Sequence, residues 1–315
     1  MMKNVISILL LMIVSFSSMA QEIANKDEVH INVNEVLTEN DTLVELQENK
    51  KLILNNSESD LDIIKSIPKD AWALIKAPVG WSKKEWIIAS GAVTMTTLLM
   101  VGDVRVRDFF QNNKSHFSEQ VSYYSEKGGS QAPIGLAATY LLGTILKNQK
   151  LKKASTLAFS SLLISGVLVQ GLKQVFSRTR PYAASNQWEF QGPGKLRGSD
   201  NVSFPSGHTA AAFSIAASIA TIYDSKLVKI LAYSAATLTG LSRIHDNKHW
   251  MSDVFMGALI GTVSGIFITK RHMMMKPNSR IKLAPTIINV NNQTAYGIGI
   301  TIRLDKKKKK RKPLF

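Results

Sequence analysis

Three short polar clusters in the C-terminal half of the chain carry residue types that suit chemistry on phosphate groups. The clusters read Lys173-x6-Arg180-Pro181, Pro205-Ser206-Gly207-His208 and Ser242-Arg243-x5-His249-x3-Asp253. Together they provide three cations, two imidazoles, one carboxylate and a Ser-Gly helix start. Cations hold phosphoryl oxygens through charge-assisted hydrogen bonds, which are bidentate for arginine. If the clusters meet in space, they form a phosphate-transfer site that contains no metal.

The first cluster places two cations at the end of an apolar segment. Lys173 and Arg180 are seven residues apart, so they share a helical face if the helix continues that far. Pro181 then ends the helix or turns the chain. Cations in an apolar setting need an anion or water beside them, and a phosphate group meets that need. A positively charged flank of a membrane helix explains this pair at least as well.

The second cluster predicts the start of a helix. Pro205 and Ser206 are typical of a helix N-terminus, and Gly207 lets the backbone come close to a ligand. Free N–H groups and the helix dipole make such an end an anion site. His208 stands where it could donate a proton to a leaving oxygen. Taken by itself, a capping turn is the simpler interpretation of this cluster.

The third cluster pairs an imidazole with a carboxylate. His249 and Asp253 are four residues apart, so we expect them on one face of a helix, with Arg243 in the turn that enters it. A carboxylate bonded to one ring nitrogen fixes the tautomer and leaves the other nitrogen free to attack. A structural ion pair is the alternative.

Six apolar segments of helical length surround the clusters. They are rich in Ala, Gly, Ser and Thr, small residues that let helices approach closely in a membrane. Most are near or below the ~20 residues that a span needs, so they are either short spans or buried helices of a bundle. Two of them separate the first cluster from the third, so all three clusters can gather at one end. The segments cover residues 86–101, 132–146, 155–176, 208–222, 227–241 and 254–269.

Two further stretches before the clusters have weaker patterns. Residues 61–82, broken by Pro68 and Pro78, predict short helices that lie at a membrane interface or on the surface of the core. Residues 103–131 predict either an amphipathic helix or a solvated connector helix.

The N-terminus has the features of a secretory signal. Lys3 precedes an apolar stretch at residues 5–16, and small residues lead up to Ala20. We expect residues 1–20 to be a signal peptide, cleaved during export from a bacterial cytoplasm; an uncleaved anchor is the alternative. Residues 21–60 are polar and predict a linker or a disordered arm.

The last forty residues, 276–315, change character again. Residues 281–304 form two β-rich runs around an Asn-rich turn, which predicts a hairpin. The second run alternates apolar residues on one face. A lysine-rich tail follows at 306–312.

Composition narrows the function classes. The 315 residues carry a formal net charge of +16, part of it in the terminal lysine run. A basic balance suits nucleic acid, an anionic membrane surface or anionic substrates. Of these, the clusters favour a phosphate-bearing substrate at a membrane, and we expect no nucleic-acid partner. The chain has no Cys, which excludes disulfides, thiolate metal sites and Cys nucleophiles.

The three clusters, in this order and spacing, resemble the type 2 phosphatidic acid phosphatases. That family shares its core with bacterial acid phosphatases and vanadium haloperoxidases, and every specified position of its pattern is matched here. The resemblance covers about residues 86–270 and implies a phosphatase domain over 83–275. The implied fold is all-α: a six-helix bundle, membrane-embedded or membrane-associated, with the short C-terminal β-hairpin outside it.

The resemblance also implies a division of roles. His249 would be the nucleophile that forms a phosphohistidine, Asp253 would orient it, and His208 would protonate the leaving group and later activate water. No metal and no cofactor is implied, because cations and amides neutralise the developing charge. The phosphoryl oxygens would be held by Lys173, Arg180, Ser206, the Gly207 amide and Arg243.

Several functions remain open at this point. We expect a phosphatase acting on phosphate monoester or diphosphate groups of lipids. The alternatives are an acid phosphatase for small soluble esters, a vanadium haloperoxidase and a non-catalytic lipid-binding protein of the envelope. Residues 182–202 are either a substrate-facing loop or a passive connector.

Two opposing signals bear on orientation. With a cleaved signal peptide and six spans, the clusters would face the cytoplasm. Basic residues at 147–153 and 270–271, however, sit at the opposite ends of the helices, and basic flanks stay cytoplasmic. We expect an active site that faces the periplasm, on a bundle embedded in the membrane or attached to its surface.

Overall fold

The computed structural model describes residues 59–195, 198–223, 225–274, 281–290 and 293–302. The predicted signal peptide, the polar arm and the lysine-rich tail lie outside these residues, so those statements stay predictions. The described residues fall into two compact units, a helical unit that runs from Ser59 to His272 and a second unit that holds two strands.

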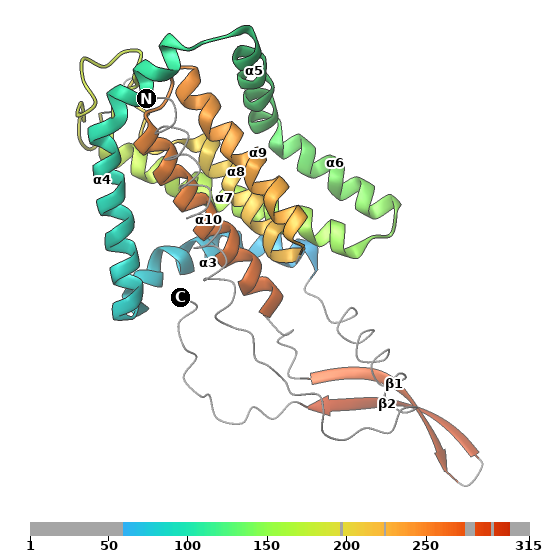
Figure 1. Cartoon of the computed structure of the whole chain (residues 1–315). Coiled ribbons are helices and arrows are strands. Elements are labelled where there is room, and N and C mark those ends of the chain that lie inside the picture. Colours follow the sequence, from blue (N-terminus) through green and yellow to red (C-terminus); the bar gives the residue numbers. More distant parts are fainter. Residues whose placement is uncertain (1–58, 196–197, 224, 275–280, 291–292, 303–315) are drawn as a thin grey trace. The chain divides into compact units, whose positions relative to one another are not determined.

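The helical unit contains eight α-helices in its described part rather than the six expected (Figure 1). Six of them coincide with the predicted apolar segments, and the other two, α3 and α5, come from the stretches with weaker patterns. A 3-10 turn, η1 (Ala77–Gly80), follows α3. The helices are α3 (Asp60–Lys76), α4 (Lys83–Asn112), α5 (His116–Ser130), α6 (Ala132–Ile145), α7 (Gln149–Phe176), α8 (Gly207–Ile222), α9 (Lys226–His245) and α10 (Met251–Met274).

Side-chain caps explain where several helices begin. Ser82 and Glu85 form a capping box at the start of α4, and Asn148 accepts a hydrogen bond from the N–H of Leu151 at the start of α7. Pro68 does not break α3, contrary to expectation. The buried face of α3 packs with α7 and α10 in one apolar cluster, and this tertiary packing outweighs the hydrogen bond that proline removes.

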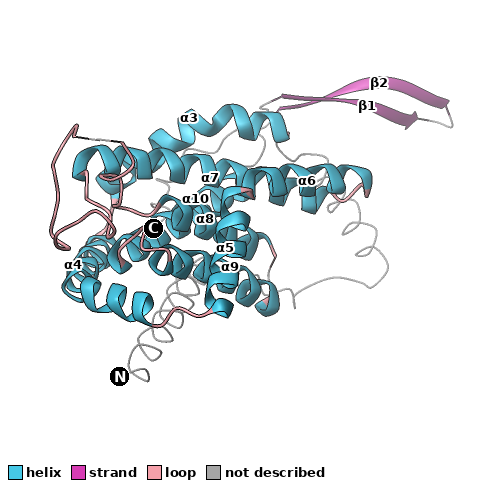
Figure 2. Ribbon diagram, turned by 90° about the horizontal axis from the view of Figure 1, so that it is seen from above, coloured by secondary structure: helices cyan, strands magenta, loops and turns pink. Residues whose placement is uncertain are grey.

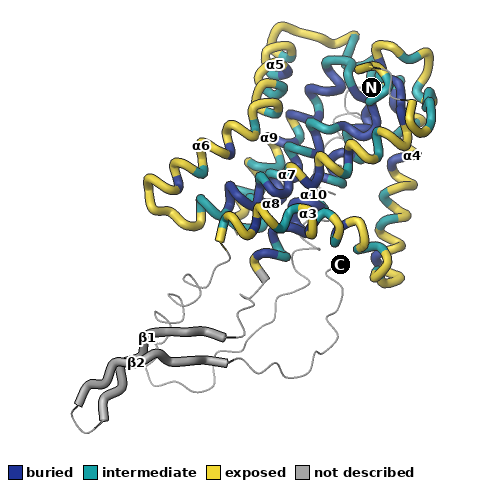
Figure 3. Tube along the Cα trace, turned by 180° about the vertical axis from the view of Figure 1, so that it is seen from behind, coloured by how far each residue is buried: buried dark blue, intermediate teal, exposed yellow. Residues whose placement is uncertain are grey.

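The buried centre of the bundle is formed by α7, α8 and α10 (Figure 2). Most buried residues follow these helices, whereas α4 and α6 are largely exposed (Figure 3). Gly257, Gly261 and Gly265 repeat every four residues along one face of α10. A Cβ atom at Gly257 would lie 2.5 Å from the carbonyl oxygen of Ser206, and one at Gly265 would lie 2.5 Å from that of Ser214. The backbone of α10 therefore contacts α8 directly, which holds the beginnings of the two helices together.

Three helices of the described chain, α4, α7 and α10, are long and apolar enough to cross a membrane. Helices α6 and α8 are apolar but shorter. The apolar window of α4 is only 11% buried, and Ile87, Leu98 and Val101 on it are exposed. The sequence left the six apolar segments open as short spans or buried helices, and three helices of the described chain are candidate spans. The orientation conflict arose only if all six segments span, so it loses its premise.

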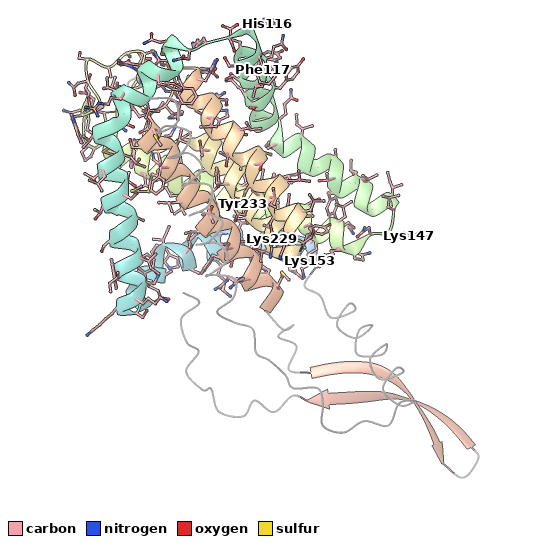
Figure 4. The ribbon with its side chains drawn as sticks, viewed as in Figure 1. His116, Phe117, Lys147, Lys153, Lys229 and Tyr233 are labelled. Carbon is pink, nitrogen blue, oxygen red and sulfur yellow. The ribbon has the colours of Figure 1, made fainter. Side chains whose placement is uncertain are left out.

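The labelled side chains of Figure 4 mark the two ends of the bundle. Lys147, Lys153 and Lys229 gather at one end, whereas His116 and Phe117 lie at the other (Figure 4). The three clusters singled out in the sequence lie away from the lysine end. Helix α7 begins at that end, at Gln149, and the first cluster starts in its last turn with Lys173 and continues into the following loop.

The second unit contains β1 (Ile281–Val290) and β2 (Gln293–Ile302), paired antiparallel with Ile281 opposite Ile302. Their side chains are outside the described part of the structure. The apolar face predicted for the second run therefore stays a prediction.

Candidate active site

The structure brings the three clusters together where α7 and α9 end and α8 and α10 begin (Figure 1). The backbone N–H of Ser206 donates to the carbonyl oxygen of Asp253 at 3.0 Å, which joins the second cluster to the third. Arg178, inside the first cluster, forms an ion pair with Asp253. Helix α5 passes the same place, since a Cβ atom at Gly129 would lie 3.7 Å from Cδ2 of His208.

His249 and Asp253 are neighbours, although they do not share a helix. His249 precedes α10, and Asp253 lies in its first turn. The Nδ1 atom of His249 is 3.6 Å from Oδ2 of Asp253, an ion-pair separation that exceeds a hydrogen bond. Within the described residues this buried Nδ1 has no hydrogen-bond partner. The carboxylate is thus on the side of the ring that the sequence predicts, at a longer distance.

A buried network holds the carboxylate of Asp253 in place. Arg178 reaches Oδ1 of Asp253 at 2.6 Å and Oδ2 of Asp103 at 2.8 Å, and all three side chains are fully buried. The other oxygen of Asp253 accepts from Ser203 Oγ and from the backbone N–H of Trp250. Asp103 lies on α4, so this network ties α4 to the start of α10. One arginine between two carboxylates satisfies charges that would otherwise be costly to bury.

The two cations of the first cluster do not share a helical face, contrary to the prediction. Helix α7 ends at Phe176, and Ser177 takes a left-handed conformation with φ of 43°. Arg180 therefore lies in the loop, where its N–H donates to the carbonyl oxygen of Asp200. The helix ends before Pro181 because the chain turns inward to bury Arg178. The buried Nε of Arg180 has no hydrogen-bond partner among the described residues.

The second cluster begins α8 as predicted, but Ser206 does not cap it through its side chain. The hydroxyl of Ser206 bonds the hydroxyl of Thr209 at 2.8 Å and leaves the first backbone N–H groups of the helix without a side-chain acceptor. Gly207 and His208 are half-buried at this end. The end of α8 therefore keeps the free donors that suit an anion.

Arg243 lies in the last turn of α9 and not in the turn entering α10, as the spacing had suggested. Its side chain is buried, and all of its nitrogens have partners. Nη1 pairs with Glu126 at 3.0 Å, Nη2 pairs with Asp246 at 2.9 Å, and Ser242 Oγ accepts from Nε and Nη2. Glu126 also pairs with Lys248 at 3.1 Å.

The site favours neutral imidazoles. Burial, together with the nearby charges of Lys173 and Arg180, lowers the pKa of His249 to about 4, although Asp253 opposes them. Burial also lowers the pKa of His208 below its ordinary value of 6.5, with Arg243 as the next cause. Lys173, Arg180 and Arg243 therefore lie close enough to these two rings to interact with them electrostatically.

Comparison with models of protein families shows which family the region around the candidate site belongs to. Residues 154–276 match the model of the PAP2 superfamily. These residues belong to the PAP2 superfamily. The matched region starts near the beginning of α7, ends after α10 and contains all eight residues predicted for the site.

Relatives of this chain include lipid phosphatases. A lipid A 1-phosphatase of Porphyromonas gingivalis is 43% identical over 76 residues, 23% of this chain and 17% of that protein. A putative phosphatidate phosphatase of Drosophila melanogaster is 33% identical over 113 residues, 32% of this chain and 30% of that protein. The chain thus matches less than a third of the length of either relative.

Two solved structures also resemble the chain. The crystal structure of Aquifex aeolicus LpxE has 28% identity and a TM-score of 0.40, over 53% of this chain and 94% of that chain. A transmembrane PAP2 type phosphatidylglycerolphosphate phosphatase of Bacillus subtilis has 18% identity and a TM-score of 0.42, over 60% of this chain and 98% of that chain.

Sequence reasoning missed five side chains that shape the PAP2 site. Arg178, Ser203 and Lys248 lie within the matched region, and Asp103 and Glu126 lie before it. The sequence does not single out Asp103, because Glu85 and Asp108 are further carboxylates of the same helix. Nothing in the sequence indicated that Glu126, more than 100 residues before Arg243, would reach it.

Proposed function

We propose that this protein is a phosphatase that removes phosphate monoester or diphosphate groups from lipids through a phosphohistidine intermediate. Nε2 of His249 attacks phosphorus while Asp253 holds the opposite side of the ring. His208 gives a proton to the leaving oxygen and then activates the water that hydrolyses the P–N bond. Lys173, Arg180 and Arg243, with the first N–H groups of α8, bind the phosphoryl oxygens.

The observation that carries this proposal is the setting of His249. A buried imidazole with a low pKa is neutral at ordinary pH, so its ring nitrogen is available as a nucleophile. Cations on two sides of it suit a phosphate dianion, and the fixed carboxylate of Asp253 stabilises the imidazolium character that develops during attack. An arrangement built only for structure would pair the cations with protein carboxylates, yet Nε of Arg180 is left without a partner among the described residues.

Two features favour a lipid substrate over a small soluble ester. Three helices can cross a membrane, and the exposed apolar face of α4 suits contact with acyl chains. The relatives with curated names are lipid phosphatases. We further propose an exported protein whose site faces the periplasm, with the lysine-bearing end of the bundle at the cytoplasmic surface.

Phosphate release by the purified protein tests the proposal. The protein is incubated with EDTA and with micelles of phosphatidic acid, phosphatidylglycerol phosphate, a polyprenyl diphosphate or lipid A, and separately with small phosphate esters. We expect release from at least one lipid and much slower release from the soluble esters.

Other results of this assay would favour one of the alternative functions. Preference for small esters would replace the lipid phosphatase by an acid phosphatase. Bromide oxidation with added vanadate would favour a haloperoxidase. Lipid binding by a folded protein that releases no phosphate would contradict catalysis altogether, and activity that requires Mg²⁺ would contradict the metal-free site.

A further inference from the structure

The guanidinium of Arg243 is paired with protein carboxylates. Glu126 and Asp246 take its two outer nitrogens, and Ser242 takes Nε. Arg243 is 1% exposed, so it has little room to find new partners by moving. A phosphate group that binds both outer nitrogens of Arg243 in the bidentate manner must therefore replace one of these two carboxylates.

The two carboxylates differ in how firmly they are held. Asp246 is three residues from Arg243 on the same turn, and its other oxygen accepts from Ser122 at 2.6 Å and contacts His245. Glu126 comes from a different helix, α5, and its side chain is 36% exposed. Among the described residues, its carboxylate pairs with Arg243 and Lys248. Glu126 is the partner that can move away.

One carboxylate oxygen of Glu126 bridges two cations at the site. One oxygen, Oε1, lies 3.0 Å from Nη1 of Arg243 and 3.1 Å from Nζ of Lys248. Lys248 immediately precedes His249, and the charges of Glu126, Lys248 and Arg243 all act on His208. Glu126 is ionised at working pH, because its hydrogen bond from Arg243 lowers its pKa to about 2.

We propose that Glu126 is a specificity-determining residue, a resident anion on Arg243 and Lys248 that the substrate phosphate displaces. This inference rests on the proposed phosphate site and assigns Lys248 as a further phosphate contact. An entering dianion replaces one negative charge by two and gains attraction to both cations, whereas an entering monoanion gains none. The displacement therefore favours terminal phosphates over phosphodiesters, and it weakens retention of the product, inorganic phosphate.

Calorimetric titration of the purified full chain with inorganic phosphate, at a pH where it is a dianion, tests the inference without turnover. Removal of the competing charge in Glu126→Gln should tighten phosphate binding about tenfold. Dimethyl phosphate, a monoanion, should bind the wild-type protein hardly at all and Glu126→Gln measurably. Glu119→Gln, the same charge change two turns earlier on α5 at an exposed position, should leave both affinities unchanged.

Unchanged or weaker phosphate binding by a folded Glu126→Gln would overturn the inference. If Glu126→Gln does not fold, Glu126→Ala, which removes the whole carboxylate, replaces it in the titration and should also bind phosphate more tightly than the wild type. Phosphate release from lipid substrates by the same wild-type preparation reports on the proposed function separately. A wild type that turns over, with a Glu126 variant that binds phosphate no better, contradicts the resident anion alone.

Discussion

His249 and His208 need opposite protonation states in the proposed reaction. His249 must be neutral to attack, and His208 must carry a proton to release the leaving group. Burial lowers the pKa of both rings in the empty site, that of His249 to about 4. A low pKa helps the nucleophile at neutral pH but limits the acid.

The ionisation of the two rings alone, before the second ionisation of the substrate phosphate at pH ~6 is added, predicts an acidic optimum for kcat/KM, which reports on the free enzyme and free substrate. As pH falls through about 4, His249 becomes protonated and activity is lost. As pH rises towards and beyond 6.5, His208 in the free enzyme loses its proton and activity falls again. The measurement is kcat/KM for the best substrate across this range in constant ionic strength. A flat profile from acid to alkaline pH, or a maximum in the alkaline range, would contradict the assigned roles.

The eight predicted site residues were accessible to sequence reasoning because their types and spacing are sufficient to suggest the chemistry. Their contacts were not accessible. The long separation between His249 and Asp253 depends on where α10 begins, and the pairing of Arg243 with Glu126 depends on how α5 packs against α9. Spacing along the chain determines neither.

The elements around the site are joined by one buried arginine. Arg178 links Asp103 on α4 to Asp253 on α10, and Ser252 at the start of α10 donates its N–H and hydroxyl to Asp103. Helix α4 has few other buried residues, so this contact is a large part of what fixes it against the bundle.

Substitution Asp103→Asn should destabilise the fold, because it leaves the buried Arg178 with one carboxylate instead of two. We expect a loss of about 3 kcal/mol in the free energy of unfolding, as for other broken buried ion pairs. Asp108→Asn is the matched control on the same helix, since its pair with Arg107 is only partly buried and should contribute at most about 1 kcal/mol.

Thermal unfolding in a mild detergent measures both variants. Equal midpoints for Asp103→Asn and Asp108→Asn would mean that the Asp103–Arg178 contact does not stabilise the bundle. A fall confined to Asp103→Asn agrees with the network described above.

The sequence predicted which segments are helices better than it predicted where each helix begins and ends. All six apolar segments are helices, because their length and composition suit burial or lipid on most sides. The predicted apolar segment 155–176 ends where α7 ends, at Phe176. The continuation of α3 through Pro68 could not be predicted, because it results from the packing of α3 on α7.

The molecule as a whole presents a large apolar surface on α4. Such a surface is unfavourable in water and natural in a bilayer, and the helix has the length for a span. The sequence indicated membrane association through composition alone. It left the number of full spans open, and in the described part of the chain α6 and α8 are apolar yet short.

Placing a charge in the middle of this face tests membrane integration. Leu98 is 62% exposed on α4, and Leu98→Lys should reduce the fraction of protein that resists alkaline extraction from membranes, because the cation has no partner in lipid. Val79→Lys, at an exposed position in η1 outside the candidate spans, should behave as the unchanged protein. Equal extraction of the two variants would argue that α4 does not contact lipid.

The most direct measurement is a search for phosphate on His249 during turnover. The protein is mixed with a substrate labelled in its phosphate, quenched in alkali, which preserves phosphohistidine, and examined for label on the chain. We predict label on the wild-type protein, more label on His208→Ala, where hydrolysis of the intermediate is slowed, and none on His249→Ala. A protein that releases phosphate without ever carrying label, or that carries it without His249, would contradict the proposed reaction.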